Sequence, residues 1–275
     1  MDTVDVNGAG YRRAVRTALL VLAGVVGGVI GTAGGITSLV AYPALLAAGL
    51  GPLQANIANT VALISGAVAS SAASRRELRV HRRHLPWWAA TAAAGGTAGA
   101  VLLLVTPPGV FAWIVPFLIA FAAALILLRP TIDGPAAAER DPGPGTGSRL
   151  AAPHRVLAAA AFLAVCVYSG YFGAGSGILT LAIVLVLVDT NLVRANAVKN
   201  ALTACADIVP AIVFAIVADV AWWAVIPLAT GAAIGGALGP AVTRRVDPKM
   251  LRVAVAAMGF GLAAWLLVRA AGWSS

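Results

Sequence analysis

The chain has 275 residues, of which 60% are hydrophobic and only 11% are charged, and its formal net charge at pH 7 is +9. A soluble domain carries roughly 25% charged residues, so this composition excludes a soluble globular protein. The arginines lie at the ends of apolar runs, as basic residues do in the loops of membrane proteins. The positive charge therefore does not indicate a nucleic-acid partner.

Long apolar runs predict an all-α protein that crosses the membrane many times. Residues 17–74 contain no charged side chain, and one spanning helix needs about 20 apolar residues. In the first half of the chain we predict segments at 17–31, 36–50, 53–74, 85–105 and 110–128. In the second half we predict segments at 156–172, 178–188, 195–218, 220–242 and 253–268. This makes about eight to ten membrane segments in a polytopic protein of the cell inner or plasma membrane, with the lipid bilayer as a partner.

The two sets of segments share one order of features, which indicates an internal duplication. Asn56 and Asn196 are 140 residues apart, and tryptophan pairs at 87–88 and 222–223 begin the fourth segment of each set. Residues 130–153 lie between the sets and are rich in Pro, Gly and Ala, as flexible linkers are. We therefore predict a single transmembrane permease domain over 1–275, with repeat 1 at 14–129 and repeat 2 at 154–270.

Basic residues favour an inverted arrangement of the two repeats, because loops rich in Lys and Arg stay in the cytoplasm. An odd number of crossings per repeat puts 14 basic residues inside and 4 outside, whereas four crossings per repeat put 13 inside and 5 outside. The second arrangement would also export the basic cluster at 244–252. We therefore predict both termini outside and the linker in the cytoplasm.

The second segment of each repeat is short or broken. Residues 178–188 are too few for a full crossing, and Pro43 interrupts the matching segment of repeat 1. Glycine-rich stretches at 31–35 and 173–177 precede these segments and let the backbone leave helical geometry. Broken helices at matching positions of two repeats indicate a transporter site. The alternative is that glycines only allow close helix packing, an interpretation that suits the glycines at 95, 96, 99, 231, 235, 236 and 239.

Lys199 is the sharpest single candidate for a binding residue. A charge at the centre of a membrane helix costs about 2.5–3.5 kcal/mol on insertion scales and tends to be functional. It lies only five residues past Arg194, so snorkelling to the interface is the alternative. Asn196, Lys199 and Asn200 share one helical face, and Asn56, Asn59 and Thr60 form the matching face of repeat 1. Two such faces, one of them cationic, together with the N–H donors of helix N-termini, fit a small anion.

Other titratable residues give weaker signals. Asp207 lies eight residues after Lys199 and is a candidate for proton coupling, with a position near the far membrane boundary as the alternative. His81, His84 and His154 lie in basic loops, where we expect them to be solvated. The sequence contains no catalytic motif, and Cys166 and Cys205 lack the spacing of metal ligands. We therefore expect no enzyme activity, no metal site and no cofactor.

The glycine and asparagine motifs resemble those of a known family. Gly31-Thr-Ala-Gly-Gly-Ile, followed by Pro43 and by Ala55-Asn-Ile-Ala-Asn, is similar to the first repeat of the TauE/SafE family. Gly170-Tyr-Phe-Gly-Ala-Gly-Ser-Gly and Arg194-Ala-Asn-Ala-Val-Lys-Asn resemble its second repeat, and the resemblance covers nearly the whole chain. It implies a permease for sulfite, sulfoacetate and related organosulfur anions. It also implies binding roles for Gly34, Gly35, Asn56, Asn59, Gly175, Gly177, Asn196 and Lys199.

From these observations we expect a transporter of a small anion, working by alternating access around a midplane site. The candidate substrate-binding residues are Gly34, Gly35, Thr37, Asn56, Asn59, Thr60, Gly175, Ser176, Gly177, Asn196, Lys199 and Asn200. The alternative is a membrane scaffold or lipid-binding protein whose glycines serve packing alone. A homo-oligomer is compatible with either interpretation.

Overall fold

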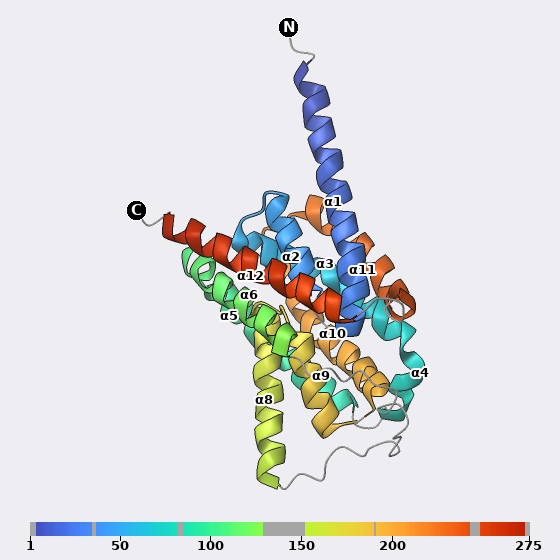
Figure 1. The fold of residues 1–275 in the computed structure, drawn as a ribbon. Helices are drawn as coiled ribbons and strands as arrows, with labels where there is room; N and C mark the ends of the chain where they lie inside the picture. Colours follow the sequence, from blue (N-terminus) through green and yellow to red (C-terminus); the bar gives the residue numbers. More distant parts are fainter. Residues whose placement is uncertain are drawn as a thin grey trace.

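The computed structural model describes residues 4–34, 37–81, 85–128, 152–189, 191–242 and 248–272. Within these ranges all regular structure is helical, which confirms the predicted all-α membrane fold (Figure 1). The helices are α1 (Val4–Gly34), α2 (Ser38–Ala47), α3 (Pro52–Ala73), α4 (Arg75–Leu78), the 3-10 turn η1 (Arg79–His81), α5 (Leu85–Val105), α6 (Pro108–Leu128), α8 (Ala152–Tyr171), α9 (Ser176–Leu187), α10 (Leu192–Val217), α11 (Trp222–Val242) and α12 (Pro248–Gly272).

Five helices of the described ranges are long and apolar enough to cross a membrane. They contain the spans Gly10–Gly31, Leu85–Val105, Pro108–Leu128, Val193–Val217 and Trp222–Gly239. The 22-residue helix α3 has a spanning length but carries too many polar residues to join them. Its asparagines at 56 and 59 are buried inside the protein, so α3 packs at the centre of the helices rather than against lipid.

Helical structure reaches beyond the apolar segments that the sequence predicts, most clearly at the start of α1 and after α3. α1 begins at Val4 rather than at residue 17, and residues 10–19 are exposed on a part of the helix that projects from the rest of the protein (Figure 1). α4 and η1 occupy a stretch where we expected a basic loop. Both differences have one cause: the end of an apolar run marks the membrane boundary, whereas a helix continues into water on polar residues.

Glycines bring several helix pairs into close backbone contact. A Cβ on Gly231 of α11 would collide with the carbonyl of Val21 on α1, and a Cβ on Gly99 of α5 would collide with that of Val167 on α8. Gly95, Gly96, Gly235 and Gly236 are equally confined by neighbouring helices. The packing interpretation is therefore right for these glycines, as small residues are expected to act in membranes.

The first helices of the two halves run in opposite directions. In Figure 1, α1 descends from its start at the top to the centre, whereas α8 rises from the bottom to the centre. The end of α12 lies in the upper half of the view, and α4 lies in the lower half. An inverted duplication predicts this opposition, and the duplication itself stays a prediction.

The predicted topology can be tested with two exposed positions, Gly10 and Arg76. In a background that lacks Cys166 and Cys205, we expect a membrane-impermeant thiol reagent on intact cells to label Gly10→Cys but not Arg76→Cys, because the inverted model puts only the first outside. After permeabilisation both should react. Labelling of Arg76→Cys alone in intact cells would contradict the predicted orientation.

Candidate functional site

The break between α8 and α9 depends on two glycines in left-handed backbone conformations. Gly173 has φ 78° and Gly175 has φ 77°, values that residues with a Cβ rarely adopt. The Ser176 N–H donates to the Gly173 carbonyl over 3.1 Å, and α9 starts at Ser176. Tyr168 fixes the loop, because its hydroxyl donates to the Ala174 carbonyl over 2.6 Å. The chain thus leaves one helix and enters the next within four residues.

A second break separates α1 from α2. α1 ends at Gly34 and α2 begins at Ser38. A Cβ on Gly31 would collide with the Thr37 side chain, so glycine at this position lets the start of α2 return against α1. Gly35, one of the predicted site residues, lies outside the described residues.

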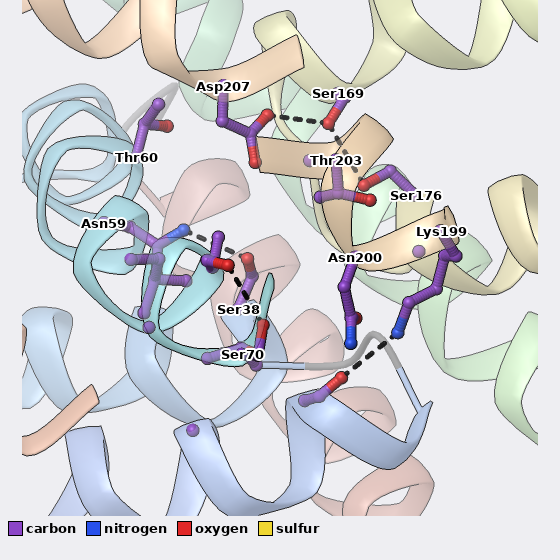
Figure 2. A pocket seen from close by; sticks show the side chains of 18 of the residues that line it. Ser38, Asn59, Thr60, Ser70, Ser169, Ser176, Lys199, Asn200, Thr203 and Asp207 are labelled. Atoms are coloured by element: carbon purple, nitrogen blue, oxygen red, sulfur yellow. Dashed lines mark hydrogen bonds between the residues drawn. The ribbon is translucent and has the colours of Figure 1, made fainter. Parts of the chain in front are cut away.

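The two breaks meet around one small polar cavity of about 90 Å³ (Figure 2). The middle of α3 and the middle of α10 complete its wall. Eight of the predicted site residues line it: Thr37, Asn59, Thr60, Ser176, Gly177, Lys199, Asn200 and Asp207. The fold therefore brings these eight residues together from four segments that lie far apart along the chain.

Lys199 points into this cavity rather than toward a membrane surface. Its side chain is 2% exposed, and its Nζ lies 3.5 Å from the Gly31 carbonyl of α1, which accepts from it (Figure 2). Asn200 beside it is also buried. Snorkelling would leave the ammonium at the lipid–water boundary, so this geometry contradicts the snorkelling alternative.

Asn59 faces Lys199's helix from α3. Its Nδ2 donates to the Ser38 hydroxyl over 3.1 Å, while its buried Oδ1 has no hydrogen-bond partner among the described residues. Thr203 Oγ1, on the opposite wall, is also buried and has no hydrogen-bond partner among the described residues. Leaving a buried polar atom unpaired costs about 1–3 kcal/mol, so both atoms indicate that the cavity takes up a polar ligand or water.

Asp207 is the acidic group of the cavity lining. The Ser169 hydroxyl of α8 donates to its Oδ1 over 2.9 Å. The hydroxyls of Ser169 and Ser176 are hydrogen-bonded 3.2 Å apart. A carboxylate thus reaches the start of α9 through two hydroxyl groups, within the cavity that also holds Lys199 (Figure 2).

Three of the other predicted residues, Asn56, Gly175 and Asn196, do not line the cavity. Asn56 turns away, and its Nδ2 donates to the Tyr171 carbonyl at the end of α8 over 2.9 Å. Gly175 faces Ala122 of α6. Asn196 lies one turn before Lys199 on α10, and Gly34 is the last residue of α1. Asn56 therefore satisfies a carbonyl that the helix break has freed.

Eleven lining residues are absent from the candidate list, although Gly31 and Gly173 belong to the two predicted glycine-rich breaks. They are Gly28, Gly31, Ser38, Leu63, Gly66, Ala67, Ser70, Ser169, Phe172, Gly173 and Thr203. Two of them carried a usable signal. Thr203 lies four residues after Lys199, about one helical turn, and Ser70 lies eleven residues after Asn59, about three turns. Each therefore lies on the same helical face as the predicted residue before it. Ser169 has no such signal, because it belongs to another helix.

A buried charge cluster lies outside the cavity, where α9 turns into α10. Asp189 is fully buried, and its Oδ2 accepts from Arg194 Nε over 2.6 Å and lies 2.8 Å from His81 Nε2. The expectation that His81 is solvated is wrong: it is 6% exposed. The reason is that η1 packs the histidine against the end of α9, a contact between residues 108 positions apart.

This cluster is expected to stabilise the fold above acidic pH. Burial alone raises the pKa of Asp189, but hydrogen bonds from Arg194, the Asn191 backbone and His81 outweigh it and hold the pKa below its ordinary value. The contribution is therefore complete above the pKa of a free carboxyl, about 4, and is lost as pH falls through the lower value.

We expect Asp189→Asn to destabilise the protein at neutral pH by about 3 kcal/mol, because it leaves Arg194 without its buried counter-charge. Thermal unfolding of the purified protein in detergent measures this. Asp219→Asn, at an exposed position after α10, is the matched control and should unfold like the parent. Equal unfolding temperatures for all three proteins would mean that the cluster contributes nothing.

Comparison with known proteins places the chain in a family. The family model for the sulfite exporter TauE/SafE matches residues 17–266. No curated protein and no solved structure matches the chain. The match includes both helix breaks, the polar middles of α3 and α10, and Lys199. The chain therefore belongs to the TauE/SafE family of sulfite-exporter-type membrane permeases, whose members are transporters rather than enzymes.

Proposed function

We propose that this chain carries a small anion, namely sulfite, a sulfonate or another organosulfur anion, through the cavity between α3 and α10 by alternating access. One observation carries the proposal: Lys199 is almost fully buried and lines a small polar cavity at the meeting point of two helix breaks. A cation inside a membrane protein is expensive, and a negatively charged ligand explains why one stands here.

Other features of the cavity support an anionic ligand. Asn200, Thr203 and Ser176 offer amide and hydroxyl donors on its wall, and oxyanions accept such hydrogen bonds. Gly177 lines the cavity at the second position of α9, where helix N–H groups lack intrahelical partners. The N-terminal end of the helix dipole adds partial positive charge on the same side as Lys199.

Alternating access would use the two breaks as hinges. Asn56 of α3 binds the broken end of α8, and Lys199 of α10 contacts the broken end of α1. Each half of the chain thus holds the broken helix of the other half. We propose that rocking of one half against the other opens the cavity first to one side of the membrane and then to the opposite side.

The scaffold alternative accounts for only part of the glycines. Those on α5 and α11 serve close packing, as their backbone contacts require. Gly173 and Gly175 instead adopt a left-handed backbone, which close packing does not need. A scaffold also gives no reason for a buried cation that lines a cavity together with unpaired buried polar atoms.

The proposed function can be tested with the purified full-length chain in proteoliposomes. We expect flux of sulfite or of a small sulfonate such as methanesulfonate above that of protein-free vesicles, with weaker flux for an uncharged analogue such as dimethyl sulfone. Flux of sulfate and of acetate, measured in the same way, shows how transport depends on the charge and the shape of the anion. Failure to bind or move any of these anions, with the protein shown to be folded, would contradict the proposal.

A further inference from the structure

Asp207 lines the cavity together with Lys199. It has no role in the anion binding described above. It lies eight residues after Lys199 on α10, so about 12 Å separates their positions along the helix axis. Both line the cavity of about 90 Å³. An anion bound at Lys199 would therefore share a small cavity with a carboxylate. Two negative charges about 12 Å apart at an effective dielectric constant of about 20 repel enough to weaken binding about tenfold.

Few other charged or titratable groups lie on the elements that pack against α10. α3, α5 and α9 carry none within their described ranges. α8 carries His154 and Arg155 in its first turn and Cys166, Tyr168 and Tyr171 nearer its end. α4 carries Arg75, Arg76 and Glu77. On α10 itself the Cys205 thiol lies two residues before Asp207, and the nearest charge is that of Lys199. The charge of an anion in the cavity therefore adds to the effects that burial and the Ser169 hydrogen bond already have on Asp207.

We propose that Asp207 is the proton-coupling group of this transporter, taking up one proton when an anion binds at Lys199. This inference rests on the proposed function. The proton comes from water that enters the cavity and binds Oδ2, because Oδ1 already accepts from Ser169. It leaves to water when the cavity opens on the other side. The anion and the proton that its binding recruits thus move in the same direction, and binding linkage makes the effect reciprocal.

Two hydroxyl groups connect this protonation to the helix break. Ser169 has one proton, so donating it to Asp207 leaves Ser176 to donate to Ser169. The chain of bonds runs from α10 through the end of α8 to the first residue of α9. A hydrogen bond to a carboxylate is roughly twice as strong as one to a neutral acid. Protonation of Asp207 therefore loosens the link that holds α8 and α9 together across the break.

The test measures anion binding and proton uptake at once. The full-length chain in lipid nanodiscs is titrated with methanesulfonate, which stays singly charged, in weakly buffered solution containing a pH-indicator dye. For the parent we expect affinity that rises about tenfold as pH falls across the titration of Asp207. Linkage then sets proton uptake that peaks at about half a proton per anion within that pH range and vanishes well above and well below it. Asp207→Asn should bind with an affinity independent of pH and without proton uptake. Asp219→Asn, an exposed carboxylate outside the cavity, should behave like the parent.

Each contrary result has a distinct meaning. Methanesulfonate binding by the parent without proton uptake, or with a requirement for sodium instead, overturns the coupling role and leaves the proposed function standing. Proton uptake that persists in Asp207→Asn overturns the assignment to this residue. Absence of binding to methanesulfonate, sulfite and sulfate by the folded parent overturns the proposed function and this inference with it. Because the parent is measured by itself, a failure of Asp207→Asn to fold does not remove the test.

Discussion

Lys199→Ala is expected to weaken anion binding by about tenfold to a hundredfold and to reduce transport in proportion. A hydrogen bond to a charged group contributes about 1.5–3 kcal/mol, and the ammonium is the cationic group of the described cavity lining. The folded yield should stay near that of the parent, because removing an intramembrane charge eases insertion. Binding of methanesulfonate and flux in proteoliposomes measure the two effects.

Lys199→Arg and Arg75→Ala are the matched controls. Arginine keeps the charge but replaces a compact ammonium by a planar fork, so transport should fall only in part. Arg75 is exposed on α4, outside the cavity, and its removal should leave binding unchanged. Parent-like binding and transport by Lys199→Ala would refute the site assignment.

Gly175→Ala is expected to reduce transport per folded molecule by about tenfold or more. Gly175 has φ 77°, and a non-glycine residue held in a left-handed conformation costs of order 1–3 kcal/mol. A Cβ would also lie 3.2 Å from the Cβ of Ala122 on α6. Strain at this point would displace Ser176 and Gly177 from the cavity wall. Initial flux, normalised to folded protein from size-exclusion chromatography, is the measurement.

Gly261→Ala is the control for this substitution. Gly261 lies within α12, and a Cβ there meets nothing within 4 Å, so both folding and flux should match the parent. If Gly175→Ala lost only folded protein and kept full flux per molecule, its glycine would serve stability and not the binding site.

The sequence predicts the helices well because the membrane limits the possibilities. A segment in lipid must be apolar over a spanning length, and residues 85–105 were predicted with the bounds that α5 has. The same physics marks Lys199, since a charge among apolar residues has few explanations. Helical periodicity then associates Asn200 with it. The cavity's main cation and its amide neighbour were therefore identifiable before the structure.

Contacts between distant segments could not be predicted in this way. Serine is common in membrane helices, so nothing in the sequence separates Ser169, which binds Asp207, from serines that serve packing. Asn56 shares the face of Asn59, yet it turns to a carbonyl freed at the end of α8. The Asp189–His81 contact joins parts of the chain that only the tertiary fold brings together. Residue type and spacing give the candidates, and the direction of each side chain depends on its partner.

The most direct test of the central claim locates the anion itself. Selenite has the shape and charge of sulfite and contains an anomalous scatterer. Crystals of the full-length protein grown with selenite should show one strong selenium peak in the cavity between α3 and α10. Its oxygens should lie within hydrogen-bond distance, about 3 Å, of Lys199 Nζ, and the peak should be absent in Lys199→Ala. A selenium peak elsewhere, with an empty cavity in a protein that transports selenite, would contradict the account.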